Sequence, residues 1–216
     1  MIETVATNGT VQAAAYDPLT GDLFFVIGNT LYVNNLNGEE LSVVAGTLSG
    51  LPIGGVFLNG NYYYLDGDPN SPSYMEIIEV TLTYDPNTGT WSLAENSDFS
   101  EAISNGLSIV DMASDGSSIY FLGVDNLDNG FLFSFDGNEF SDLTPTNLGA
   151  DAQIAFGADG LMYAIVQDQD GNNVLNWVDL SSGDSDAVDP GAGPIKDGED
   201  GEDSSDDIFG EFVDRR

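Results

Sequence analysis

The feature that most constrains this fold is a ladder of short strand-like runs that recurs along the chain. Runs of β-forming residues stand at 21–26, 60–65, 117–122 and 160–165, each bounded by Gly, Asn, Asp or Ser. Their aromatic anchors are separated by 39, 57 and 43 residues and are Phe24, Tyr63, Tyr120 and Tyr163. The recurrence predicts four copies of one supersecondary unit.

A second ladder follows the first in the same order. Each unit continues as a strand, a Gly-containing turn and another strand, which is typical of a β-hairpin. The turn glycines are 51, 48 and 46 residues apart and are Gly38, Gly89, Gly137 and Gly183. Two ladders of similar period favour four-stranded units of about 40 to 50 residues.

A further apolar run precedes each first-ladder strand: VQAAAY, IGGVFL, LSIVDMA and AQIAFG. We expect these runs to form the innermost strands around a central channel. The pattern resembles the β-propeller families over residues 1–189, and AAYDPLTGDLFFVIGNTLYV resembles the layout of a hemopexin-like blade. The disulfide that closes the hemopexin propeller is impossible here, because the chain has no Cys. We therefore expect an all-β, four-bladed β-propeller of antiparallel sheets, with a β-sandwich as the alternative.

The repeat also predicts the boundaries of its units. We expect blades at 8–46, 50–93, 109–145 and 150–189, with 94–108 as an insertion where the first ladder's spacing lengthens. The segment MIETVAT alternates as a strand does and is expected to complete the last blade. Such closure would remove an exposed sheet edge.

The composition changes after residue 189. Residues 190–207 are rich in Gly, Pro and acids, which predicts an extended linker. Residues 208–216 carry apolar i, i+4 pairs followed by arginines, which predicts a short amphipathic docking peptide. Its two readings are binding to a partner and folding back onto a face of the propeller. The docking residues are Ile208, Phe209, Phe212, Val213, Arg215 and Arg216.

Charge excludes several functions. The net charge is −34, there is no His or Cys, and the first cation in the sequence is Lys196. Nucleic acid and anionic membranes are poor partners for such a chain. Catalysis that needs His, Cys or a cationic stabiliser is equally disfavoured, so we expect a non-enzymatic protein. Asp111, beside an inner strand, is the best candidate for a glycosidase-type acid, and its alternative role is a hydrogen-bonded residue near a strand end.

Two further features suggest ligands. Three expected hairpin tips carry alternating acids and amides, as calcium loops do, and the preferred calcium ligands are Asp66, Asp68 and Asn70. The alternative is local turn capping by Asp and Asn. Tyr74, in the irregular loop PNSPSYME, is the aromatic residue best placed for ligand binding.

Together these features predict a structural or adhesive binding module. We expect it to attach to a protein partner in a larger assembly through its C-terminal peptide, as a phage capsid decoration or tail component does. The alternative is a calcium-assisted carbohydrate-binding surface protein of a halophilic or marine microbe. We expect the protein at the surface of a virion or in the extracellular space, with the cytoplasm of a halophile as the alternative location. Either location is compatible with a homo-oligomer.

Overall fold

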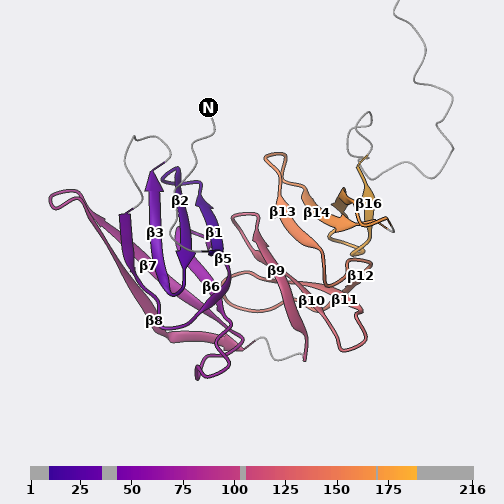
Figure 1. The fold of residues 1–216 in the computed structure, drawn as a ribbon, viewed down its shortest axis with the longest axis horizontal. Helices are drawn as coiled ribbons and strands as arrows, with labels where there is room; N and C mark the ends of the chain where they lie inside the picture. The colour runs from indigo at the N-terminus through magenta and orange to yellow at the C-terminus, as the bar shows by residue number, and fades with distance from the viewer. Residues whose placement is uncertain (1–9, 36–42, 103–105, 169, 189–216) are drawn as a thin grey trace, which may run out of the picture.

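In a computed structural model of the chain, four antiparallel sheets follow one another along the sequence (Figure 1). The structure describes residues 10–35, 43–102, 106–168 and 170–188, and within them all helical or extended structure is β-strand. Each sheet has four strands that pair in chain order. This up-and-down order is the one that two consecutive hairpins produce.

The first two sheets, blades 1 and 2, are the N-terminal half of the array. Blade 1 consists of β1 (Val11–Asp17), β2 (Asp22–Ile27), β3 (Thr30–Asn35) and β4 (Val43–Thr47). Blade 2 consists of β5 (Pro52–Leu58), β6 (Asn61–Asp66), β7 (Glu76–Asp85) and β8 (Thr90–Ala102).

The third and fourth sheets, blades 3 and 4, form the other half. Blade 3 consists of β9 (Ser108–Ser114), β10 (Ile119–Val124), β11 (Gly130–Phe135) and β12 (Thr144–Thr146). Blade 4 consists of β13 (Gln153–Phe156), β14 (Met162–Gln167), β15 (Asn173–Val178) and β16 (Ser185–Ala187).

The expected insertion at 94–108 differs from the structure. Residues 94–102 belong to β8, which continues past a register shift and pairs with the start of β7 through Glu76↔Ala102 and Ile78↔Ser100. The reason is the length of β7, which spans 10 residues and so offers backbone partners beyond the ordinary hairpin. The longer spacing between ladder anchors is thus partly a longer outer strand.

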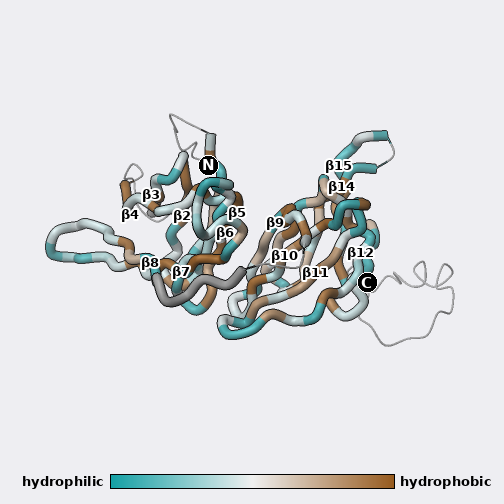
Figure 2. Tube along the Cα trace, turned by 90° about the horizontal axis from the view of Figure 1, so that it is seen from below, coloured by the Kyte–Doolittle hydropathy of each residue, from teal (hydrophilic) through white to brown (hydrophobic). Residues whose placement is uncertain are grey.

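The core lies between successive sheets. One cluster joins blades 1 and 2, a second joins blades 2 and 3, and a third joins blades 3 and 4. Large side chains dominate them; those with almost no exposed surface include Phe24, Tyr62, Tyr64, Phe121 and Phe135. Burying such rings supplies most of the apolar burial of a β fold. Figure 2 shows apolar residues gathered in the middle of the array and polar ones along the projecting β7–β8 hairpin.

Glycines allow the sheets to approach closely. A Cβ on Gly46 of β4 would collide with Leu93 of β8, and a Cβ on Gly54 of β5 would lie 2.8 Å from the Met112 sulfur of β9. Asn59 and Gly60 both have positive φ and close the tight β5–β6 turn. The small residues are therefore requirements of blade packing and turn geometry.

The inner strands meet in succession, β1 with β5, β5 with β9 and β9 with β13. The predicted four-bladed β-propeller is thereby confirmed, with core clusters of the described residues between blades 1 and 2, 2 and 3, and 3 and 4 but not between blades 4 and 1. The four runs expected as inner strands correspond to β1, β5, β9 and β13. The segment MIETVAT, the acidic linker and the docking peptide lie outside the described residues.

Candidate binding site

The four inner strands line one hollow with a volume of about 580 Å³, within the range of small-ligand and peptide sites. Blades 1, 3 and 4 contribute residues of the inner strand and of the loop that follows, and blade 2 contributes residues within β5 alone. The lining residues are 14–16 and 18, 55–57, 112–116, and 154–158 with 160.

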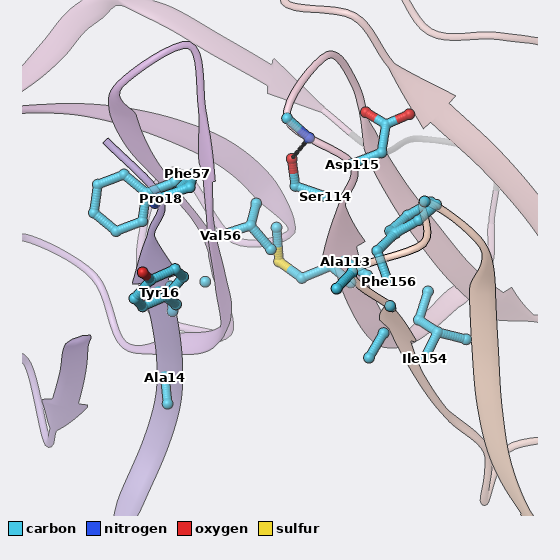
Figure 3. Close-up of a pocket in the computed structure, with 18 residues that line it drawn as sticks. Ala14, Tyr16, Pro18, Val56, Phe57, Ala113, Ser114, Asp115, Ile154 and Phe156 are labelled. Atoms are coloured by element: carbon cyan, nitrogen blue, oxygen red, sulfur yellow. Dashed lines mark hydrogen bonds between the residues drawn. The ribbon is translucent and has the colours of Figure 1, made fainter. Parts of the chain in front are cut away.

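The lining is mainly apolar. Figure 3 shows Tyr16 and Pro18 on one side of the hollow, Ile154 and Phe156 on the opposite side, and Val56 between them. Tyr16 is 54% exposed although it stands in a strand, because its alternating position faces the hollow and not the core. A half-exposed ring beside apolar walls is a common anchor for a partner's side chain.

Ser114 and Asp115 supply the polar groups at one end of the hollow (Figure 3). The Asp115 carboxylate accepts hydrogen bonds from the backbone N–H groups of Ser117 and Ser118, at 2.8 and 2.7 Å. Desolvation alone raises the pKa of Asp115, but these hydrogen bonds outweigh it and hold the pKa below its usual value. Asp115 is therefore ionised at neutral pH and gives this end a negative charge.

Asp111, the glycosidase-type candidate, connects two blades. Its Oδ2 accepts the N–H of Ile154 in β13, and its Oδ1 accepts the N–H of Met112, both at 2.8 Å. Burial raises the pKa of Asp111, against the opposing effect of these two donors. The arrangement is that of a hydrogen-bonded residue joining inner strands, which is the alternative role expected from its sequence position.

The field around the hollow has one sign. Lys196 is the first cation in the sequence, so every charged side chain in the described part of the chain is Asp or Glu. The described charges around the hollow are therefore all negative. Clefts with walls of a single sign of charge concentrate ligands of the opposite sign.

Of the preferred calcium residues, Asp66 ends β6 whereas Asp68 and Asn70 lie in the β6–β7 loop, and they make different hydrogen bonds. Asp66 is fully buried, and its carboxylate accepts hydrogen bonds from the Leu51 and Asp68 N–H groups and from the Ser73 hydroxyl, at 2.8 to 3.0 Å. Asp68 Oδ1 instead accepts both the backbone and side-chain N–H of Asn70. Asp66 therefore closes the loop, while Asp68 caps a local turn.

The other two acidic tips follow the same local pattern. Asp125 accepts hydrogen bonds from the Leu127 and Asn129 N–H groups, and Asp168 accepts those of Asp170 and Asn172. Among the described residues, no group of three or more acidic side chains is placed to hold a metal ion. The hydrogen bonds fit the turn-capping alternative.

Tyr74 lies beside a second hollow. It is 51% exposed and, with Ile53, Met75 and residues 106–109, lines a space of about 490 Å³ between the β6–β7 loop and the start of β9. Tyr62, Tyr63 and Tyr64 are buried instead, as expected for core positions. The predicted docking residues, Ile208 to Arg216, lie outside the described residues.

The residues of the central hollow were not singled out from the sequence. The sequence signal for the hollow was that the inner runs combine small residues with the period-two alternation of a strand, as in AAAY and GGVF. Alternation marks which side chains leave the core, but the convergence of four such strands appears only in three dimensions.

Comparison with known proteins finds distant structural likeness and no relative in sequence. No protein-family model matches the chain, and no curated protein matches it in sequence. A WD40 β-propeller domain of Doa1 is similar at 15% identity, with a TM-score of 0.45, over 83% of this chain and 68% of that one. A chain of the mitotic checkpoint complex is similar at 9% identity and a TM-score of 0.45, over 81% of this chain and 48% of that one. In the described part of the chain, we find no helix long and apolar enough to span a membrane.

Proposed function

We propose that the protein is a non-enzymatic protein-interaction module whose central hollow holds an apolar side chain of a partner. The supporting observation is the convergence of four inner strands on one apolar space with the half-exposed Tyr16 at its wall. β-Propellers are protein-interaction folds in many settings, which is support by analogy of fold.

The partner segment that fits this site has an aromatic or aliphatic anchor flanked by Lys or Arg. The apolar lining favours the anchor through burial, and the acidic surroundings favour the flanks through long-range attraction. Binding of this kind weakens as salt screens the charges, whereas the apolar contact persists.

Fluorescent peptides test this function directly. The probes are short peptides with one central Trp, flanked by lysines in one and by glutamates in the other. We expect only the lysine-flanked peptide to bind, with a loss of about tenfold for Tyr16→Ala, as for removal of an interface aromatic. Leu127→Ala, which changes a residue 76% exposed at a hairpin tip, is the matched control. Equal binding by Tyr16→Ala and the unmodified protein would contradict the assignment.

We further propose that the C-terminal peptide attaches the propeller to a larger assembly, and that a virion surface is the setting. The support comes from composition alone: an acidic linker followed by an apolar, arginine-ended peptide. Deleting residues 190–216 is expected to abolish assembly and leave the melting temperature unchanged. A clear loss of stability would instead identify the peptide as a cap on its own propeller.

The second candidate is carbohydrate binding assisted by calcium. Its support is the exposed Tyr74 beside the second hollow, since aromatic rings stack on sugar faces. It predicts retention on immobilised glycans that requires calcium and is lost in Tyr74→Ala. Retention that survives a chelator would contradict the calcium requirement, and its absence on a broad glycan array would contradict the function.

A further inference from the structure

Equivalent positions in the four blades show which faces of the array are covered. The residue two places after each ladder anchor lies on the face that each blade turns toward the next one, here called the forward face. It is Val26, Leu65 and Leu122 in blades 1 to 3, with exposed fractions of 0, 1 and 0%. In blade 4 the same position is Ile165, which is 43% exposed.

The cross-strand partners of these residues repeat the contrast. They are Leu31, Ile77 and Leu132 in blades 1 to 3, with 0, 0 and 4% of their surface exposed. The partner in blade 4 is Leu175, at 46%. Blade 4 thus carries the apolar pattern of an interblade face, but among the described residues no further blade covers it.

The neighbouring row on blade 4 extends the same face. Tyr163, the fourth ladder anchor, pairs with Trp177, and both rings remain half-buried. The Tyr163 hydroxyl donates to the Asp159 carboxylate at 2.7 Å. Two aromatic and two aliphatic side chains therefore form the forward face of blade 4.

Blade 1 has the opposite face, its rear face, which is only partly covered: Phe25 in the middle is buried at 4% and Tyr32 is half-buried, whereas the outer positions are exposed. Ala14, Phe25, Tyr32 and Val44 are in register there, with Phe25 stacked on Tyr32 at 5.4 Å. Val44 is 51% exposed, and Ala14 is exposed toward the central hollow, which it also lines. The counterparts of Ala14 in the other blades are buried against a preceding blade or inner strand; they are Gly55, Met112 and Ile154.

These two faces do not cover each other. The described residues form three interblade clusters, and none of them joins blade 4 to blade 1. Figure 1 shows β13 and β14 on the far side of an opening from β1 and β2. The array therefore ends in the two complementary halves of an interface that it builds three times internally.

We propose that a second copy of the chain covers both faces, with blade 4 of each copy packed against blade 1 of the other. A forward face always meets a rear face within the chain, so the contact between copies continues an interface already present. Two such contacts related by a two-fold axis close a ring of eight blades, which leaves no unfilled face. The charge of −34 on each copy opposes this association. Because salt screens that repulsion, the association should strengthen with salt.

Light scattering during gel filtration, at about 1 M NaCl where the screening length is about 3 Å, tests the proposal. We expect twice the chain mass of 22.9 kDa for the full chain. Ile165→Asp and Val44→Asp should each give monomers with at least a tenfold weaker association. Leu127→Asp adds the same charge at a hairpin tip and should remain a dimer. Circular dichroism and thermal melting establish that each variant is folded.

Mixing the two disrupted variants gives the decisive result. Together they still possess one intact forward face and one intact rear face, so an equimolar mixture should recover dimers that neither variant forms alone. Failure to recover them would overturn the head-to-tail arrangement. A full chain that stays monomeric at high salt and concentration, or a Leu127→Asp variant that dissociates as readily, would overturn the proposal itself.

Discussion

The carboxylate of Asp111 in β9 accepts the backbone N–H of Ile154 in β13 at 2.8 Å, so one side chain bonds the inner strands of two blades. Its other oxygen accepts the Met112 N–H. Asp111→Asn keeps the size of the side chain but has only one acceptor oxygen. We expect a loss of about 1 to 3 kcal/mol in the free energy of unfolding, measured by urea titration. Asp142→Asn removes one negative charge from an exposed position and should leave the free energy of unfolding nearly unchanged.

The difference in free energy of unfolding between the unmodified protein and Asp111→Asn should depend on pH. Burial raises the pKa of Asp111 above its unfolded value, so the protonated form favours the folded state. The resulting stability is fully present below the unfolded pKa and is lost as pH rises through the folded pKa. The stability gap between the unmodified protein and Asp111→Asn should therefore widen as pH falls from about 7 to about 4. A constant gap would show that Asp111 titrates alike in both states.

Asp66 should show the opposite slope. Burial alone raises its pKa, but hydrogen bonds from Ser71, Asp68, Ser73 and Leu51 leave the pKa below its usual value. Its stabilisation is therefore present above the unfolded pKa and is lost as pH falls through the folded pKa. We expect Asp66→Asn to cost about 1 to 3 kcal/mol at neutral pH, with a gap that narrows in acid. The same urea titrations, repeated across pH, measure both slopes.

Two neighbouring tyrosines should respond to the same substitution with opposite signs. The Tyr62 hydroxyl is buried and has no hydrogen-bond partner among the described residues, so Tyr62→Phe removes an unsatisfied group and should stabilise the protein by about 1 kcal/mol. The Tyr64 hydroxyl donates to Glu95 at 2.8 Å, so Tyr64→Phe should destabilise by a similar amount. Thermal melts of the two variants provide the measurement.

A double-mutant cycle checks the position of the Tyr62 hydroxyl. A Cβ added at Gly55 would collide with that hydroxyl, so Gly55→Ala should cost about 1 to 3 kcal/mol. The cost should shrink when Tyr62→Phe is present, because the colliding oxygen is gone. Strict additivity of the two changes would contradict the contact.

Salt should stabilise the fold of a single copy. No cation occurs before Lys196, so self-repulsion among the acids is unrelieved by ion pairs in the described part of the chain. If about 1 M NaCl increases the free energy of unfolding by about 2 kcal/mol, the melting temperature should rise by roughly 4 to 8 °C. The Ile165→Asp variant, measured at low concentration, separates this effect from dimer formation. A melting temperature that stays the same between low and high salt would contradict this prediction.

Sequence reasoning reached the architecture because the repeat is carried by residue type. The aromatic anchors and inner runs correspond to strands, and Gly89, Gly137 and Gly183 correspond to turns, whereas Gly38 lies outside the described residues. The length of β8 was missed because pairing beyond a hairpin depends on how far β7 extends. The role of Asp66 was also missed, since a turn residue becomes buried only when its loop folds back over it.

The exposed faces of blades 1 and 4 could not be predicted from the sequence for a different reason. Ile165 and Leu175 are the residue types expected for a covered position, so periodicity assigns them to a core as it does Leu65 and Ile77. Whether a next blade arrives to cover them is a property of the whole array. The hollow at the inner strands depends on the array in the same way.

The three interblade clusters also set an order of local stability. Blades 2 and 3 each take part in two clusters, whereas blades 1 and 4 take part in one. In a linear array of this kind, units with one neighbour open more often than units with two. Amide protons of β6 and β10 should therefore exchange with solvent more slowly than those of β14, and association with a second copy should slow β14 selectively.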